Sequence, residues 1–269
     1  MRDRDQVDAE NWGEMGTSED EREFLEEASQ AVDSEVCFLP SATDQAVRVL
    51  GAIRDSATWV ASDRPDFYSL PNQIGLEVMR VDDHPKVGKV TNPTLARERE
   101  VKRELLAAFP SIAKDARISV LASTDLPSYQ DHNIEAYRDI FHRVLTGHAR
   151  KVEAYRENHP GYLIVMLVRD ESSAYAITEQ PVPVLRNGQS TPARPHLWFL
   201  DSHFTNVIAE SNADFIIWST PYKHVWHLDP SGQRVKMDLP ALAIYDVAEM
   251  ARWSESVTYD PRFIVSLEE

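Results

Sequence analysis

The chain is poor in cysteine and has no long apolar run. Its 269 residues include one cysteine, Cys37, which has no partner for an internal disulfide. A lone thiol in a chain of this length is typical of a reducing compartment, so we predict a cytoplasmic protein. The longest apolar run, at 162–168, is far shorter than the roughly 18 residues of a membrane span, and the first 15 residues lack the apolar core of a secretory signal. We therefore expect no membrane partner.

Glycine is also scarce, with nine in the whole chain. Neither GxxxxGK[ST] nor GxGxxG occurs, which argues against nucleotide-cradling loops. Nine histidines raise the question of zinc, but the chain has neither HExxH nor a Cys-His set. His224 and His227 are three residues apart, so on one strand they would face opposite sides of the sheet. Zinc is therefore not the metal that this sequence favours.

Basic residues are outnumbered, and the net charge of −16 is unevenly spread. Residues 1–35 hold 13 acids and 3 bases and account for −10 of it. We interpret them as an acidic N-terminal arm with a helix at 17–32, either a solubilising segment or a mimic of DNA that covers a basic groove. The charge argues against strong nonspecific binding of nucleic acid over the whole surface.

Hydrophobic periodicity predicts an α/β fold. Residues 41–60 indicate a helix with Val47, Leu50, Ile53 and Ala57 on one stripe. Further helical patterns cover 94–109, 134–159, the surroundings of 202–211 and 240–253. Apolar or alternating segments indicate strands at 66–70, 73–81, 116–123, 162–170, 196–201, 214–220 and 224–229, with a last strand in the tail. We expect a mixed central β-sheet flanked by helices.

The apolar segment YLIVMLVRD at 162–170 predicts a central strand that is covered on both faces. Residues 36–269 are expected to form a single domain. The Pro-rich connector at 179–195 is the best candidate for a boundary within it, although the segments that follow can extend the same sheet.

Two carboxylates occupy the expected strand pair at 66–70 and 73–81. If Leu70 pairs with Gln73 across the Pro71-Asn72 turn, Asp66 falls opposite Glu77. Directly opposed Cβ atoms lie roughly 4.5–5.5 Å apart. A shift of one residue would instead place Glu77 on a diagonal.

Two ionised carboxylates at this separation repel each other unless one binds a proton or a cation joins them. Glu77 lies within the apolar run IGLEVM, where a charge is costly unless it is matched. Mg²⁺, with Mn²⁺ as the alternative, takes one or two carboxylates together with water and phosphate oxygens. We therefore predict a metal site at Asp66 and Glu77. A surface hairpin with two solvated acids is the other interpretation.

The segment PDF…IGLEV, followed by HARKVEAYRENHPGYLIVML, resembles the PD-(D/E)XK nuclease superfamily over roughly residues 42–168. It is similar in particular to uncharacterised restriction-endonuclease-like proteins with a PDF…IGIEV hairpin. The resemblance implies a restriction-endonuclease-like core and metal-dependent hydrolysis of phosphodiester bonds, in DNA rather than RNA, in restriction or phage defence. It assigns Asp66 and Glu77 as metal ligands and catalytic residues.

The third motif position departs from that pattern. Two residues after Glu77, on the same face, stands Met79 where the family has lysine. A thioether can neither activate water nor stabilise a charged transition state. Lys151, on the helix before the apolar strand, is our first candidate for a displaced catalytic lysine, and Arg150 is the second. The alternative is a catalytically inactive protein of the same fold that binds nucleic acid or a protein partner.

Overall fold

The computed structural model describes residues 18–83, 132–179, 193–221, 223, 225–228, 233–237 and 239–267. Its main element is a seven-stranded mixed sheet with the order β1-β11-β8-β5-β4-β3-β2. β4 is parallel to β5 and β5 to β8, whereas β3 is antiparallel to β4. The strands of this sheet are β1 Val36–Leu39, β2 Val60–Ala61, β3 Phe67–Ser69, β4 Ile74–Val81, β5 Leu163–Asp170, β8 Phe215–Ser219 and β11 Leu242–Asp246.

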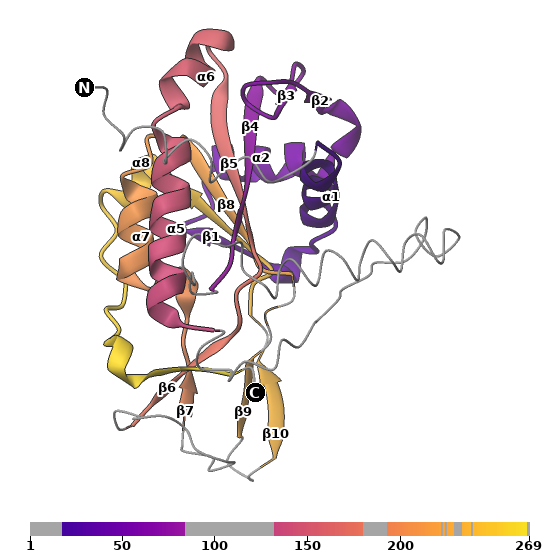
Figure 1. Ribbon diagram of the computed structural model, residues 1–269. Helices are drawn as coiled ribbons and strands as arrows, with labels where there is room; N and C mark the ends of the chain where they lie inside the picture. The colour runs from indigo at the N-terminus through magenta and orange to yellow at the C-terminus, as the bar shows by residue number, and fades with distance from the viewer. Residues whose placement is uncertain are drawn as a thin grey trace, which may run out of the picture.

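Two smaller sheets lie at one end of the main sheet (Figure 1). One contains β12 Ile264–Ser266, β6 Tyr175–Thr178 and β7 Ala193–Pro195, and the other contains β9 Val225–Leu228 and β10 Arg234–Met237. The α-helices are α1 Ser18–Ser29, α2 Asp44–Arg54, α5 Ile134–Ala149, α6 Val152–Asn158, α7 Ser202–Ala209 and α8 Val247–Met250. Short 3₁₀ turns are η1 Asp33–Glu35, η2 Ser56–Thr58, η3 Trp198–Leu200 and η4 Pro261–Phe263.

The main sheet separates two hydrophobic cores. Helices α5 and α7 cover one face, and α1 and α2 cover the other (Figure 1). β5 supplies both cores, with Met166 on the α5 side and Val165 and Leu167 on the α2 side. The predicted mixed α/β architecture and the central, doubly covered strand are therefore confirmed. Burying each such side chain contributes roughly 1.5–3 kcal/mol, which explains why β5 is apolar throughout.

The hairpin has the predicted register. Tyr68 pairs with Gly75 and Ser69 with Ile74. The Gln73 amide donates to the Leu70 carbonyl, which closes the turn, and Gln73 adopts a φ of 52° there. Leu76 packs on the α2 side of β4, so the residues on either side of it in the strand face α5.

The buried stripe of α2 differs from the predicted one. Val47 is 51% exposed, whereas Ala46, Val49, Leu50 and Ile53 are buried. The helix begins after the Thr43 cap and ends at Arg54, before the fourth predicted stripe residue. Both stripes keep helical spacing in the sequence, and packing against α1 and the sheet selects the one that is buried.

Three other element predictions need correction. The pattern at 134–159 forms two helices, because the chain breaks between Ala149 and Val152. Residues 196–201 were predicted as a strand but contain the turn η3. Residues 240–253 were predicted as a helix, but most of that segment is β11, followed by the short α8. β11 lies between β1 and β8 and is buried along its length, so strand pairing overrides the helix preference of its Ala and Leu residues.

Several predictions lie outside the described residues. These are the basic helix at 94–109, the strand at 116–123, the first 17 residues of the acidic arm and most of the Pro-rich connector. The helix of the arm is α1, and its Leu25 is fully buried. The last three residues of the connector form β7, which pairs with β6, the strand just before the connector.

Two glycines allow a matched test of packing. A Cβ on Gly75 would lie 2.9 Å from Cγ of the buried Pro65, whereas a Cβ on the helical Gly147 meets nothing within 4 Å. We expect Gly75→Ala to lower the free energy of unfolding by about 1–3 kcal/mol, since a proline ring yields little. Gly147→Ala should raise it by about 0.5–1 kcal/mol through helix propensity. Urea unfolding measures both changes, and equal stabilities would contradict the close contact at Gly75.

Candidate functional site

The structure brings Asp66 and Glu77 together at the start of the β3–β4 hairpin. The paired residues Phe67 and Leu76 come next to them in the two strands, so Asp66 lies opposite Glu77 when the register is continued. Oδ2 of Asp66 also accepts a 2.7 Å hydrogen bond from the amide of Val78. Asp66 is half-buried, and Glu77 is 4% exposed. The juxtaposition that the sequence predicted is present.

The two carboxylates interact electrostatically. The pKa of Asp66 is raised to about 8. Burial is the largest cause, and the negative charge of Glu77 is the next. The Val78 amide opposes this rise, because it stabilises the ionised form. At neutral pH Asp66 therefore holds a proton unless a cation compensates the two charges.

Glu77 is held from the helical side by two side chains. Nδ1 of His148, near the end of α5, lies 2.6 Å from Oε1 of Glu77, and both side chains are buried. The hydroxyl of Tyr155 on α6 also hydrogen-bonds Glu77. Burial and then the Glu77 charge raise the pKa of Tyr155, so its phenol stays a neutral donor. Together these contacts fix the orientation of the carboxylate.

Further charges surround the pair at its exposed edge. Lys151 precedes α6 and is exposed, and its positive charge lowers the pKa of Asp66. Glu21 of α1 also acts on Asp66 and raises its pKa. The pKa of Glu21 is itself raised, by burial and then by Glu77. Three carboxylates and one ammonium group therefore share this edge of the hairpin.

Met79 and Arg80 occupy the faces that the strand period predicts. Met79 is 4% exposed and packs in the core beneath α5, on the face of β4 that also carries Glu77. Arg80 points to the other face and forms a salt bridge with Glu171. Neither residue supplies a cation to the carboxylate pair, whereas the exposed Lys151 acts on Asp66. Arg150 is the C-cap of α5 and is also exposed.

The pair fits Mg²⁺ or Mn²⁺ in the nature of its donors. Both side chains offer hard carboxylate oxygens, and these ions bind proteins through one or two carboxylates together with water and substrate oxygens. In the part of the chain that the structure describes, no three His, Cys, Asp or Glu side chains come close enough to enclose a metal ion. A closed zinc site is therefore not present among these residues, whereas an open two-carboxylate site needs no third ligand from the protein.

A second buried polar cluster lies at the carboxyl ends of β4 and β5. Nζ of Lys223 is 2.8 Å from Oδ2 of Asp170 and 2.7 Å from Oγ of Ser172. Tyr137 and Trp218 also donate to Asp170. Lys223 is therefore a buried ion-pair partner of Asp170. These donors satisfy the Asp170 carboxylate, so among the described residues the cluster stabilises this end of the sheet.

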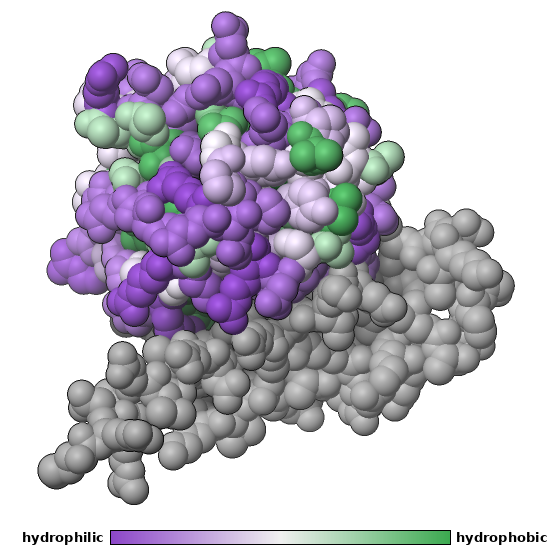
Figure 2. Space-filling view, turned by 90° about the horizontal axis from the view of Figure 1, so that it is seen from above, coloured by the Kyte–Doolittle hydropathy of each residue, from purple (hydrophilic) through white to green (hydrophobic). Residues whose placement is uncertain are grey.

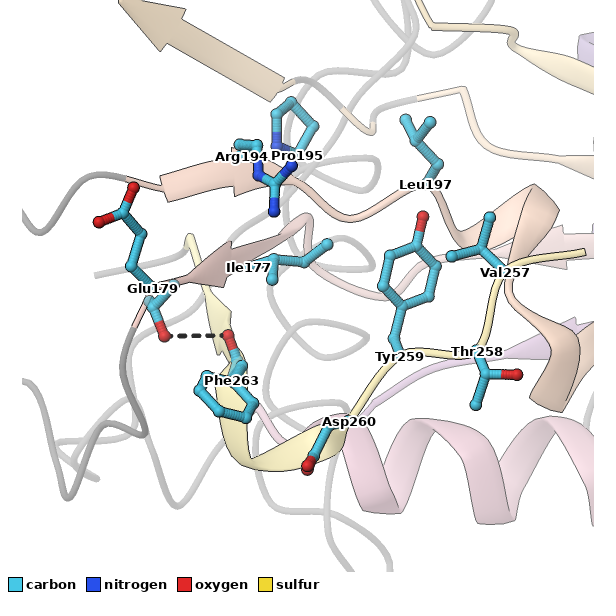
Figure 3. Close-up of a pocket in the computed structure, with 11 residues that line it drawn as sticks. Ile177, Glu179, Arg194, Pro195, Leu197, Val257, Thr258, Tyr259, Asp260 and Phe263 are labelled. Atoms are coloured by element: carbon cyan, nitrogen blue, oxygen red, sulfur yellow. Dashed lines mark hydrogen bonds between the residues drawn. The ribbon is translucent and has the colours of Figure 1, made fainter.

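A pocket of about 760 Å³ lies at the three-stranded sheet, at the end of the main sheet opposite α6 (Figures 1 and 3). Figure 3 shows Arg194, Tyr259 and Phe263 around it, on β7 and on the C-terminal segment. Most of its lining is apolar, and it is remote from the carboxylate pair. The carboxylate pair is the better candidate for chemistry, since two acids face each other there and burial and charge raise the pKa of Asp66.

The half-buried Cys37 and the buried Asp201 have structural roles. Burial raises the pKa of Cys37 to about 12, so its thiol stays protonated and is no nucleophile. Asp201 caps α7 by accepting from the amide of His203, and it also bonds Arg138 and His196. The side chains of His224 and His227, which the sequence analysis considered for zinc, lie outside the described residues.

Comparisons with known proteins add no identification. No family model, curated protein or solved structure matches this chain. Among the described residues, no helix is both long and apolar enough to cross a membrane.

Sequence reasoning missed His148, Tyr155 and Glu21 as members of the site. His148 and Tyr155 are seven residues apart, which is two helical turns, and both lie in the segment HARKVEAY that carries the family resemblance. From that spacing one could have predicted that the two side chains lie on the same face of a helix. Glu21 carried no signal, because it is one of several acids in α1 and only packing brings it to the hairpin.

Proposed function

We propose that this protein is a nuclease of the PD-(D/E)XK type that uses Mg²⁺ or Mn²⁺ to hydrolyse phosphodiester bonds in DNA. The observation that carries the proposal is the buried pair Asp66 and Glu77, whose mutual repulsion calls for a cation, beside the exposed Lys151. The exposed edge of this hairpin is where a DNA strand would bind.

The arrangement of elements supports a restriction-endonuclease-like core. A helix (α2) precedes three successive strands (β2, β3 and β4), and α5 then leads to β5, which lies parallel to β4. In this proposal Asp66, just before β3, and Glu77, within β4, take the places of the two acids of the family motif. Met79 stands at the lysine position, and Lys151, before α6, would take the role of that lysine.

The protein groups have separable roles in this proposal. A metal ion bound here would lower the pKa of a water molecule and stabilise negative charge on the phosphate. Asp66 and Glu77 would hold the ion. His148 and Tyr155 keep the Glu77 carboxylate oriented, as outer-shell partners of metal ligands do. Lys151 would stabilise the charge that develops on the phosphate oxygens or orient the attacking water.

A non-catalytic protein of the same fold is the second candidate. It is favoured by Met79, because a buried thioether replaces the expected lysine. Such a protein would bind metal or nucleic acid without cleavage.

Lys151 allows the two candidates to be separated. Because its side chain is exposed, Lys151→Ala should fold normally yet lower kcat for Mg²⁺-dependent DNA cleavage by about 10²–10³-fold. Arg150→Ala, at the neighbouring exposed cation, should keep kcat within about threefold, and Lys151→Arg should retain part of it. The measurement is a cleavage assay with labelled DNA and a metal series.

Two outcomes would count against the proposal in different ways. Wild-type cleavage that survives Lys151→Ala would remove the lysine from the mechanism. Wild-type protein that binds metal but cleaves no DNA with any divalent ion would favour the non-catalytic candidate.

A further inference from the structure

Three partly exposed aromatic rings form a row outside both hydrophobic cores. Tyr68 on β3 stacks on His159, with ring centroids 5.0 Å apart and planes inclined by 30°. His159 in turn contacts Tyr162, with a centroid distance of 5.2 Å. None of the three belongs to either described core cluster. Burial in a core therefore does not account for the row.

The row begins beside the carboxylate pair. Tyr68 is two residues after Asp66, so the two side chains leave the same face of the hairpin, about 7 Å apart along the strand. His159 follows Tyr155, the partner of Glu77, by one helical turn, and its amide donates to the Tyr155 carbonyl.

Backbone contacts hold the row in place. Nδ2 of Asn158 donates to the carbonyl of Arg64, which ties the end of α6 to the segment before Asp66. The amide of Tyr162 donates to the His159 carbonyl, and Gly161 adopts a φ of 82° in this turn. A side chain at position 161 would be strained in that conformation.

The surrounding surface suits stacking better than apolar docking or broad contact with phosphates. Figure 2, which views the molecule from the end that carries α6 and β3, shows a mostly hydrophilic surface with scattered apolar residues. The net charge of −16 opposes extended phosphate contacts with a duplex or with a single strand, so ring stacking, more than phosphate contact, would have to carry binding. The exposed Lys151 supplies a cation that acts on Asp66, and the exposed Arg64 supplies one that acts on Tyr155, the partner of Glu77.

The geometry points to a base-stacking platform for single-stranded DNA, formed by Tyr68, His159 and Tyr162, that leads an unpaired strand into the carboxylate pair. This inference rests on the proposed function and narrows its substrate to single strands or unpaired ends. Aromatic side chains bind successive bases in this way without sequence preference, because every base has a π face. In a paired duplex the bases are stacked internally, so the platform cannot engage them.

Binding to a fluorescent oligothymidylate of about 20 nucleotides tests the platform, with Ca²⁺ replacing Mg²⁺ to suppress cleavage. We expect the full-length wild type to bind this strand at least about tenfold more tightly than a duplex of equal length. Tyr68→Leu and His159→Leu, each checked for folding by circular dichroism, should each raise the Kd for the single strand by about 5- to 100-fold. Tyr68→Phe keeps the ring and should keep the affinity.

Tyr259→Leu is the matched control, because Tyr259 is also a partly exposed ring packed on a histidine, His196, but lies at the far pocket. It should bind like the wild type. Single-strand binding that is unchanged in both Tyr68→Leu and His159→Leu would overturn the inference, as would a wild type that prefers duplex or binds no single strand. Ring-dependent binding without cleavage of any DNA would refute the nuclease proposal alone, and cleavage with ring-independent binding would refute the platform alone.

Discussion

Glu77→Gln should lower kcat for metal-dependent DNA cleavage by about 10³-fold while the protein remains folded. The substitution keeps the size of the side chain and a carbonyl oxygen that can accept from His148, but it removes the charge. Loss of a charged metal ligand removes several kcal/mol of transition-state stabilisation, and about 4 kcal/mol corresponds to this factor. Steady-state cleavage kinetics and circular dichroism on the same preparation measure both properties.

Asp246→Asn is the control for this experiment. Asp246 ends β11 in the same sheet, is 7% exposed, and accepts a 3.0 Å hydrogen bond from Thr43. Its substitution also removes one buried carboxylate, but β8 and β5 lie between β11 and the β3–β4 hairpin. The rate of cleavage should therefore stay unchanged. Equal losses in the two variants would show that Glu77 acts through stability and not at the reacting centre.

The contribution of Asp66 to thermal stability in the absence of divalent ions should fall as the pH rises from about 4 to about 8. The pKa of Asp66 is about 8 in the folded protein, against an ordinary value of 3.8. Between these values the folded protein binds a proton that the unfolded chain has released, so the free energy of unfolding decreases with rising pH. The contribution is fully present below pH 3.8 and is lost as the pH rises through 8.

Asp66→Asn should remove this dependence. Asn cannot ionise and can still accept from the Val78 amide. At pH 8.5 without metal, the variant should be more stable than wild type by on the order of 2 kcal/mol, a Tm rise of roughly 4–8 °C, after allowance for the partial exposure of Asp66. At pH 4 the two proteins should melt together. Differential scanning calorimetry across this range makes the comparison.

Mg²⁺ should reverse the order of stability at pH 8.5. An ion bound only by the folded protein stabilises it by about 2.7 kcal/mol at a concentration one hundred times its Kd. Wild type should gain this increment and Asp66→Asn should gain much less, with sodium chloride of equal ionic strength as the control. A pH profile that is identical in wild type and Asp66→Asn would contradict the electrostatic account of the pair.

The hairpin could be predicted because its determinants are local. The turn at Pro71-Asn72 fixes the register, and strand alternation then places Asp66, Glu77 and Met79 on one face. These inferences needed only the two-residue alternation of a strand and the position of the Pro71-Asn72 turn.

The rest of the site depends on tertiary packing. The contact between His148 and Glu77 depends on how α5 packs across the sheet. Local sequence patterns do not determine that packing. Lys151 is near Asp66 because the helix breaks at residues 150–151, where a continuous helix was predicted. In α2 the sequence also could not tell which face is buried, because Val47 and Val49 both fit a helical period. Only tertiary packing shows that Val49 is the buried residue.

The central claim is that a divalent ion joins Asp66 and Glu77, and anomalous diffraction from a crystal grown with Mn²⁺ at pH 8 tests it most directly. The account predicts one Mn²⁺ peak within bonding distance, roughly 2.0–2.3 Å, of a carboxylate oxygen from each residue. A map with no peak there, in which the two carboxyl groups share a proton across a direct hydrogen bond, would contradict it.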